Sequence, residues 1–145
     1  MTGIDFYVLP SDSLHRRLEF ACQLTEKAVN SGHQVLLAVD DLSTAEQLDQ
    51  LLWTVKPESF LPHRIIDTTP QTDTRLKIEI THGDTCLDHH DVLIAMCAEI
   101  PVFFSRFQRY AEVVVQKADI LAQSREHWSF FQHRGYPLQH RKLGG

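Results

Sequence analysis

The chain has 145 residues, of which 43% are hydrophobic and 23% are charged, and its formal net charge is −5. This length predicts one domain that buries its own core without disulfides or metals. The acidic balance argues against broad binding to a nucleic-acid backbone, which needs a basic surface. No apolar run approaches the roughly 20 residues of a membrane span, and the first residues do not read as a signal peptide. Three scattered cysteines indicate free thiols in a reducing cytoplasm.

The first half of the chain alternates between strand and helix patterns. Residues 4–9 predict a buried strand, and Ser13 predicts the N-cap of a helix that ends at Gly32. Residues 35–39 are all apolar, as in a parallel strand that is covered on both faces. Asp41 then begins a second helix, over residues 44 to about 55.

The second half continues the alternation. A short strand is predicted at residues 65–66, and residues 76–80 alternate as in a strand with one solvated face. A buried strand (92–96), a helical turn from Pro101, a strand (111–115) and a helix (118–133) that ends at Gly135 follow. We therefore expect an α/β fold: one three-layer domain over residues 1–145, Rossmann-like, with a mostly parallel central sheet. Residues 139–145 are expected to form a flexible tail.

The sequence contains few of the residue patterns that a nucleotide-binding or metal-dependent enzyme needs. The first strand-to-helix turn, residues 9–13, has no glycine to admit a phosphate, and Asp12 would repel one. His82, Cys86 and His89 could meet a zinc ion, but their spacing matches no standard zinc module and a polar loop is the stronger interpretation. Cys22 and Cys97 have the positions of small core residues. We expect no cofactor, no bound metal and no catalytic residue.

An aromatic cluster follows the second predicted helix. Residues 48–63 read LDQLLWTVKPESFLPH and place Trp53, Phe60, Leu61 and Pro62 within ten residues. Large aromatic side chains supply much of the binding energy at protein interfaces, so this cluster could dock a partner. Trp53 and Phe60 could equally cap the core.

A second aromatic cluster lies on the last predicted helix, where Arg125, Trp128, Phe131 and Arg134 recur every three residues. This spacing predicts an aromatic and basic stripe on one helical face, with either Trp128 or Phe131 turned to the sheet. Residues 125–142 hold four Arg or Lys and one Glu, a local charge of 4 − 1 = +3. A small basic patch on an acidic body suits a short acidic ligand, although a plain solubilising tail has the same composition.

The LDxLLWxxxPESFLPH string resembles the chi subunit family of bacterial DNA polymerase III. Residues 6–9 (FYVL), residues 32–39 (GHQVLLAV) and residues 135–138 (GYPL) resemble the same family in the same order. The resemblance implies a non-catalytic adaptor whose fold is nucleotide-binding-like but lacks the nucleotide site. It also implies a cytoplasmic bacterial protein, monomeric alone, that acts at replication forks and has no membrane contact and no high-affinity contact with nucleic acid.

The resemblance further implies two partners. The psi subunit of the clamp loader would dock on Trp53 and Phe60, and we extend this surface to the neighbouring Leu61 and Pro62. The acidic C-terminal tail of single-stranded DNA-binding protein, which ends in Pro-Phe, would bind the last helix. Arg125 matches a family arginine, Trp128 stands where the family has a tyrosine, and Ser129 stands at a position that is usually lysine. The missing cation would then come from Arg134, Arg141 or Lys142. A metal- or nucleotide-dependent hydrolase and a direct nucleic-acid binder are the alternatives.

Overall fold

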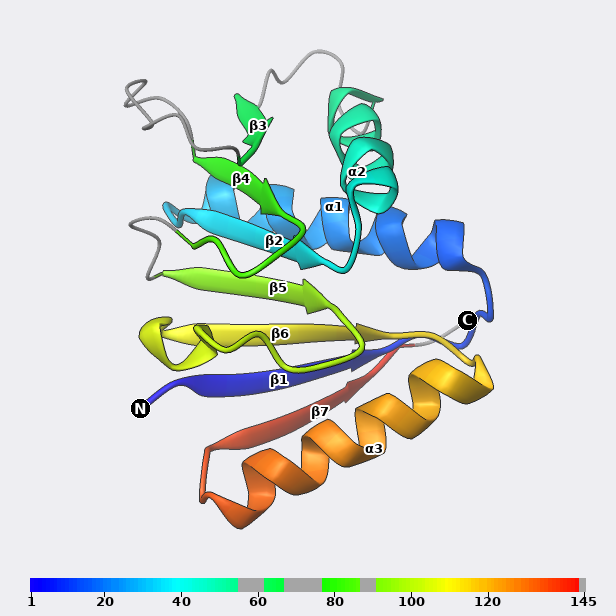
Figure 1. The fold of residues 1–145 in the computed structure, drawn as a ribbon, viewed down its shortest axis with the longest axis vertical. Helices are drawn as coiled ribbons and strands as arrows, with labels where there is room; N and C mark the ends of the chain where they lie inside the picture. The colour runs from blue at the N-terminus through cyan, green and yellow to red at the C-terminus, as the bar shows by residue number, and fades with distance from the viewer. Residues whose placement is uncertain (55–61, 67–76, 87–90, 144–145) are drawn as a thin grey trace.

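A parallel sheet runs through the centre of the molecule in the computed structural model, which describes residues 1–54, 62–66, 77–86 and 91–143 (Figure 1). Its strands are β1 (Gly3–Val8), β2 (Val35–Val39), β3 (His63–Ile65), β4 (Ile78–Thr81), β5 (Val92–Met96), β6 (Arg109–Val114) and β7 (Leu138–Lys142). They lie in the order β3-β4-β2-β5-β6-β1-β7, and every neighbouring pair is parallel. The predicted α/β fold with a mostly parallel sheet is confirmed.

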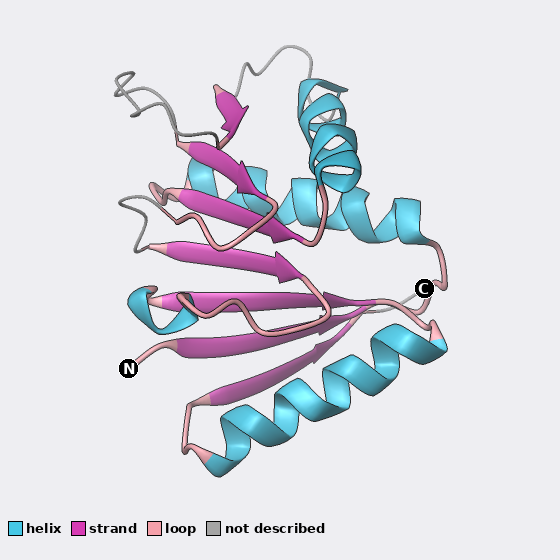
Figure 2. Ribbon diagram, in the orientation of Figure 1, coloured by secondary structure: helices cyan, strands magenta, loops and turns pink. Residues whose placement is uncertain are grey.

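Helices cover both faces of the sheet (Figure 2). The α-helices are α1 (Leu14–Asn30), α2 (Leu42–Thr54) and α3 (Ala118–His133), and a 3₁₀ turn spans Phe104–Arg106. Successive side chains of a strand point to opposite faces. Tyr7 packs on Phe20 of α1, while the preceding Phe6 packs on Trp128 of α3. Helices α1 and α3 therefore lie on opposite faces, and α2 packs against α1. The three layers follow the prediction.

Capping residues set the helix boundaries that the sequence predicts. The Ser13 hydroxyl oxygen accepts a hydrogen bond from the Arg16 N–H at 3.1 Å. A carboxylate oxygen of Asp41 accepts from the Thr44 N–H at 2.7 Å, at the start of α2. Each cap satisfies one of the N–H groups that the first helical turn leaves without a partner. After α1, Gly32 adopts a φ of 92°, which a residue without a β-carbon tolerates best.

Strand β4 differs from its prediction. All four of its residues are buried, so the expectation of one solvated face is wrong. The alternation arises because Glu79 points inward, where its carboxylate accepts from Nε of Arg64 on β3 at 2.7 Å. From a sequence, a glutamate that is buried and paired with a cation cannot be distinguished from one that faces solvent.

Strand β7 was not predicted, and it includes residues 139–142 of the segment expected to be a flexible tail. It pairs with β1 at the sheet edge, where Asp5 accepts from Arg109 of β6 at 3.0 Å and from Arg141 of β7 at 3.1 Å. This carboxylate links β1 to both neighbouring strands. Four of the five β7 residues are exposed, which removes the apolar pattern that would have revealed the strand.

None of the helices described by the structure combines the length and the apolar character needed to cross a bilayer. Helix α3 instead contributes its buried residues Ile120, His127 and Phe131 to the core beneath the sheet.

Candidate functional site

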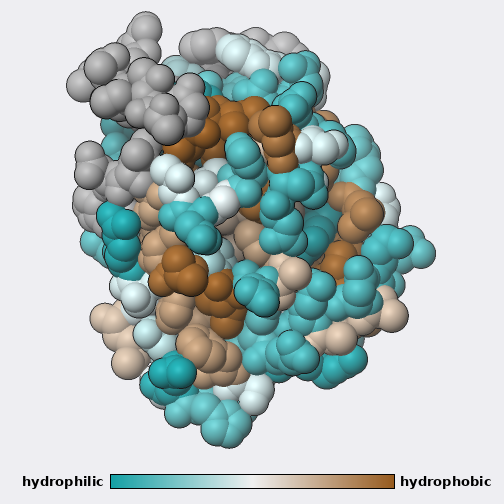
Figure 3. Space-filling view, viewed as in Figure 1, coloured by the Kyte–Doolittle hydropathy of each residue, from teal (hydrophilic) through white to brown (hydrophobic). Residues whose placement is uncertain are grey.

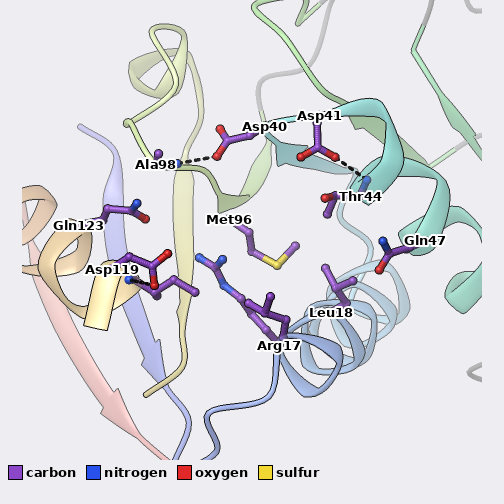
Figure 4. A pocket seen from close by; sticks show the side chains of 12 residues that line it. Arg17, Leu18, Asp40, Asp41, Thr44, Gln47, Met96, Ala98, Asp119 and Gln123 are labelled. Atoms are coloured by element: carbon purple, nitrogen blue, oxygen red, sulfur yellow. Dashed lines mark hydrogen bonds between the residues drawn. The ribbon is translucent and has the colours of Figure 1, made fainter. Parts of the chain in front are cut away.

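The crevice at the carboxyl ends of the parallel strands is the usual ligand position of an α/β fold. Here it has a volume of about 370 Å³. It lies between the starts of α1, α2 and α3 (Figure 4). Three carboxylates, those of Asp40, Asp41 and Asp119, line it together with Arg17 from α1.

The charges of this crevice do not suit a phosphate. Asp40 accepts from the Ala98 N–H at 3.0 Å, and Asp41 is held as the α2 cap (Figure 4). Burial lowers the pKa of Arg17, which nevertheless remains a cation. One arginine faces three carboxylates, so an anionic ligand would be repelled. The crevice supports the expectation, drawn from the glycine-free turn, that the fold lacks a nucleotide site.

The cysteines are not poised for catalysis. Burial raises the pKa of both Cys22 and Cys97 to about 12, so they are neutral thiols at pH 7. Cys22 is a core residue, as predicted. Cys86 is buried, and burial raises its pKa also.

The possible zinc loop is only partly described. His82 and Cys86 lie within the described residues, whereas His89 lies outside them. Within the described part of the chain, no three His, Cys, Asp or Glu side chains are grouped to hold a metal ion.

Trp53 and Pro62 form what we call the Trp53 surface, at the end of α2 and beside β3. Trp53 is 46% exposed, which is unusual for so large an apolar side chain. Its ring packs on the His63 ring with 4.6 Å between the centroids, and His63 Nε2 lies 3.2 Å from a carboxylate oxygen of Asp49. Trp53 is therefore held on the surface rather than in the core. Phe60 and Leu61, predicted for the same surface, lie outside the described residues, and Pro62 is half-buried.

The structure distinguishes Trp128 from Phe131, the two aromatic residues of α3 of which the sequence predicted that one faces the sheet. Phe131 is fully buried among aromatic core residues that include Phe104 and Tyr110. Trp128 is half-buried, with its ring against Phe6 at 5.3 Å and against His140 of β7 at 6.1 Å. Trp128 is the one that faces the surface.

The predicted four-residue stripe does not form one face. Arg125 and Ser129 are exposed near Trp128 on α3. Arg134 instead places its guanidinium 4.4 Å from the Phe130 ring centroid. A helix of 3.6 residues per turn rotates by about 100° per residue, so nine residues carry Arg134 about half a turn from Arg125. Residues spaced by three shift progressively around a helix, so Arg134 does not share a face with Trp128.

Strand β7 adds residues that the predicted site lacks. His140 contacts Trp128, and Lys142 follows two residues later on the same strand. We call Arg125, Trp128, Ser129, His140 and Lys142 the Trp128 surface. Reasoning from the sequence named Lys142 as one of three possible cations and did not consider His140, because neither β7 nor its position beside α3 was predicted.

Apolar side chains of the described residues also gather at other places on the face drawn in Figure 3. Figure 3 shows small apolar patches separated by hydrophilic side chains on this side of the molecule. A further apolar hollow of about 490 Å³ lies between the β5–β6 connection and α3, next to the exposed Val102.

Taken together, fold and surface define a Rossmann-like α/β domain with an acidic crevice and with an aromatic side chain held at the surface beside each edge strand. The chain belongs to the DNA polymerase III chi subunit family: residues 1–139 match the family described as "DNA polymerase III chi subunit, HolC".

Its relatives carry the same description over nearly their whole length. The chain is 37% identical to the DNA polymerase III subunit chi of Pseudomonas aeruginosa, over 99% of this chain and 98% of the relative. It is 28% identical to the subunit chi of Haemophilus influenzae, over 96% of both chains. It is 25% identical to that of Escherichia coli, over 95% of this chain and 96% of the relative. The resemblance noted in the sequence is confirmed.

Proposed function

We propose that this chain is a non-catalytic accessory subunit of the replicative DNA polymerase III that bridges two partners. Its Trp53 surface would bind the psi subunit of the clamp loader. Its Trp128 surface would bind the acidic C-terminal tail of single-stranded DNA-binding protein. It would act as a monomer until it binds psi, in the bacterial cytoplasm at replication forks. Membership in the chi family supports a place in the polymerase complex.

The observation that carries the proposal is the position of the two aromatic side chains. Trp53 packs on a residue of β3 and Trp128 packs on a residue of β7, and these are the two edge strands of the sheet. Six strand spacings of about 4.8 Å separate the edges, or about 29 Å. Two partners can therefore occupy these positions together, as a bridge requires.

The Trp53 surface has the properties of an interface anchor. Trp53 exposes 46% of its area and is oriented by His63, so little ordering remains to be done on binding. A buried tryptophan at the centre of an interface contributes about 2 kcal/mol or more.

The Trp128 surface matches the chemistry of a short acidic peptide with an aromatic end. Trp128 offers a half-buried ring for the terminal Phe, while Arg125 offers a guanidinium that can bind a carboxylate through two hydrogen bonds. The local excess of positive charge on an otherwise acidic chain would attract such a peptide.

Calorimetric titration with an acidic peptide that ends in Pro-Phe tests the proposal. We expect a Kd on the order of micromolar that weakens at higher salt, because the carboxylates contribute through charge. Arg125→Ala should weaken binding, and deletion of the terminal Phe should abolish it.

A peptide that fails to bind at either salt concentration would contradict the proposed tail site. Single-stranded DNA of any sequence serves as the competing ligand. Tight binding of bare DNA with a steep salt dependence would favour a direct nucleic-acid binder instead.

A further inference from the structure

The resemblance to the chi family implies a lysine at the position of Ser129, so the acidic peptide would lose a cation here unless another residue provides it. We propose that Lys142, on edge strand β7, supplies that cation, so that the peptide site is formed by α3 and β7 together. This inference rests on the proposed function and assigns one residue of the same site.

The alternation of β7 places Lys142 on the α3 side of the sheet. His140 contacts Trp128 of α3, whereas Arg141 lies over Tyr7, whose ring packs on α1. Residues two apart on a strand share a face, so Lys142 lies on the face of His140. The next residue agrees with this assignment, because Leu143 lines the hollow that Tyr7 and Phe20 form on the α1 face.

The same geometry excludes the other two candidate cations. Arg141 is on the α1 face and donates to Asp5 at 3.1 Å. Arg134 packs on the Phe130 ring, about half a helical turn away from Arg125. Of the three basic residues that could replace a lysine at 129, only Lys142 is placed beside Trp128.

Lys142 also lies level with Arg125 along α3. The helix and β7 run in opposite directions, since a short turn after α3 leads back into β7 (Figure 1). Two strand residues advance about 6.6 Å from His140, and four helical residues rise about 6 Å back from Trp128. Lys142 therefore sits opposite Ser124 and Arg125, and two cations flank one side of the Trp128 ring. A peptide with its Phe at Trp128 would direct its carboxylates between them.

The test is the titration with the acidic Pro-Phe peptide, applied to Lys142→Ala. We expect roughly two- to fivefold weaker binding at low salt, the range of exposed ion pairs, with a smaller loss at high salt. Lys27→Ala is the matched control, because Lys27 is an exposed lysine on α1, on the other face. That variant should bind as the wild type does.

A double variant tests whether a lysine at position 129 can replace Lys142. Ser129→Lys in the Lys142→Ala background should restore the lost affinity, since it returns a cation to the helix residue that follows Trp128. If Lys142→Ala binds like the wild type while Arg125→Ala does not, the assignment of Lys142 is wrong and the tail site stands. If the wild type binds no peptide, the proposed function itself fails.

Discussion

At the scale of single residues, the buried pair His127 and Glu112 is the clearest case of a charge inside this core. The two ring nitrogens of His127 face acceptors, the Glu112 carboxylate at 2.7 Å and the Ala98 carbonyl at 2.9 Å. The same carboxylate oxygen accepts from the Tyr110 hydroxyl at 2.7 Å. Only the protonated imidazolium donates from both nitrogens. Burial by itself would lower the pKa of His127, but Glu112 and Ala98 together raise it above 6.5.

This pair predicts a pH dependence of stability. A pKa that is higher in the folded than in the unfolded protein stabilises the fold fully below about pH 6.5, and the effect is lost as pH rises through the folded pKa. We expect the free energy of unfolding, measured by urea titration, to fall over that interval. In His127→Gln the slope should disappear. Below about pH 6.5 stability should drop by about 1 to 3 kcal/mol, because buried Glu112 loses a charged donor and keeps only the Tyr110 hydroxyl and the nearby Arg17.

The control for this prediction is His133→Gln, which changes an exposed histidine on the same helix. Its stability should follow the wild-type pH profile. A His127→Gln variant that keeps the full wild-type slope would show that another group titrates.

Residue identities alone could not distinguish buried from exposed members of one helix. Trp128 and Phe131 are both large and aromatic, and a spacing of three places them on neighbouring rather than identical faces. The choice depends on β7, because the Trp128 ring is held between Phe6 and His140. Glu79 shows the same limit, since its inward direction depends on Arg64 of a different strand.

At the scale of elements, the boundaries that the sequence predicted best are those with their own local signals. Ser13, Asp41 and Gly32 act within their own turns, so a linear pattern contains them. Strand β7 has no such signal, since it is defined only by pairing with β1, which lies more than a hundred residues earlier. Its position could be found only after the strand order was known.

The hydrogen bonding of β7 yields a prediction about proline. Ile4 donates to the Pro137 carbonyl and Leu143 donates to the Val8 carbonyl, each at 2.9 Å. In a parallel pair this pattern repeats every two residues, so the N–H of Gln139 points to β1 and that of His140 points to the open edge. Gln139→Pro should therefore lower the free energy of unfolding by about 1 to 3 kcal/mol, the cost of one lost ladder hydrogen bond, as judged by thermal denaturation.

Gln139→Ala is the matched control, because it removes the exposed side chain and keeps the N–H. It should melt close to the wild type. If both variants melt like the wild type, β7 does not pair with β1 in solution.

At the scale of the whole molecule, the sheet acts as a rigid spacer between its two edges. Five strands lie between β3 and β7, and their residues are nearly all buried. Well-packed cores have few alternative arrangements, so binding at one edge has little means of changing the other. The bridge we propose is therefore a passive one, in which two partners bind independently.

Trp53→Ala tests this independence. Loss of an anchoring tryptophan should weaken binding of purified psi by about thirtyfold or more, while the acidic peptide should bind with an unchanged Kd. The fold should change little, because Trp53 is 46% exposed, and its melting temperature serves as the check. Trp128→Ala is the reciprocal variant, which should lose the peptide and keep psi. A Trp53→Ala protein that melts normally but loses both partners would mean that the two surfaces are coupled, and a passive bridge would then be the wrong description.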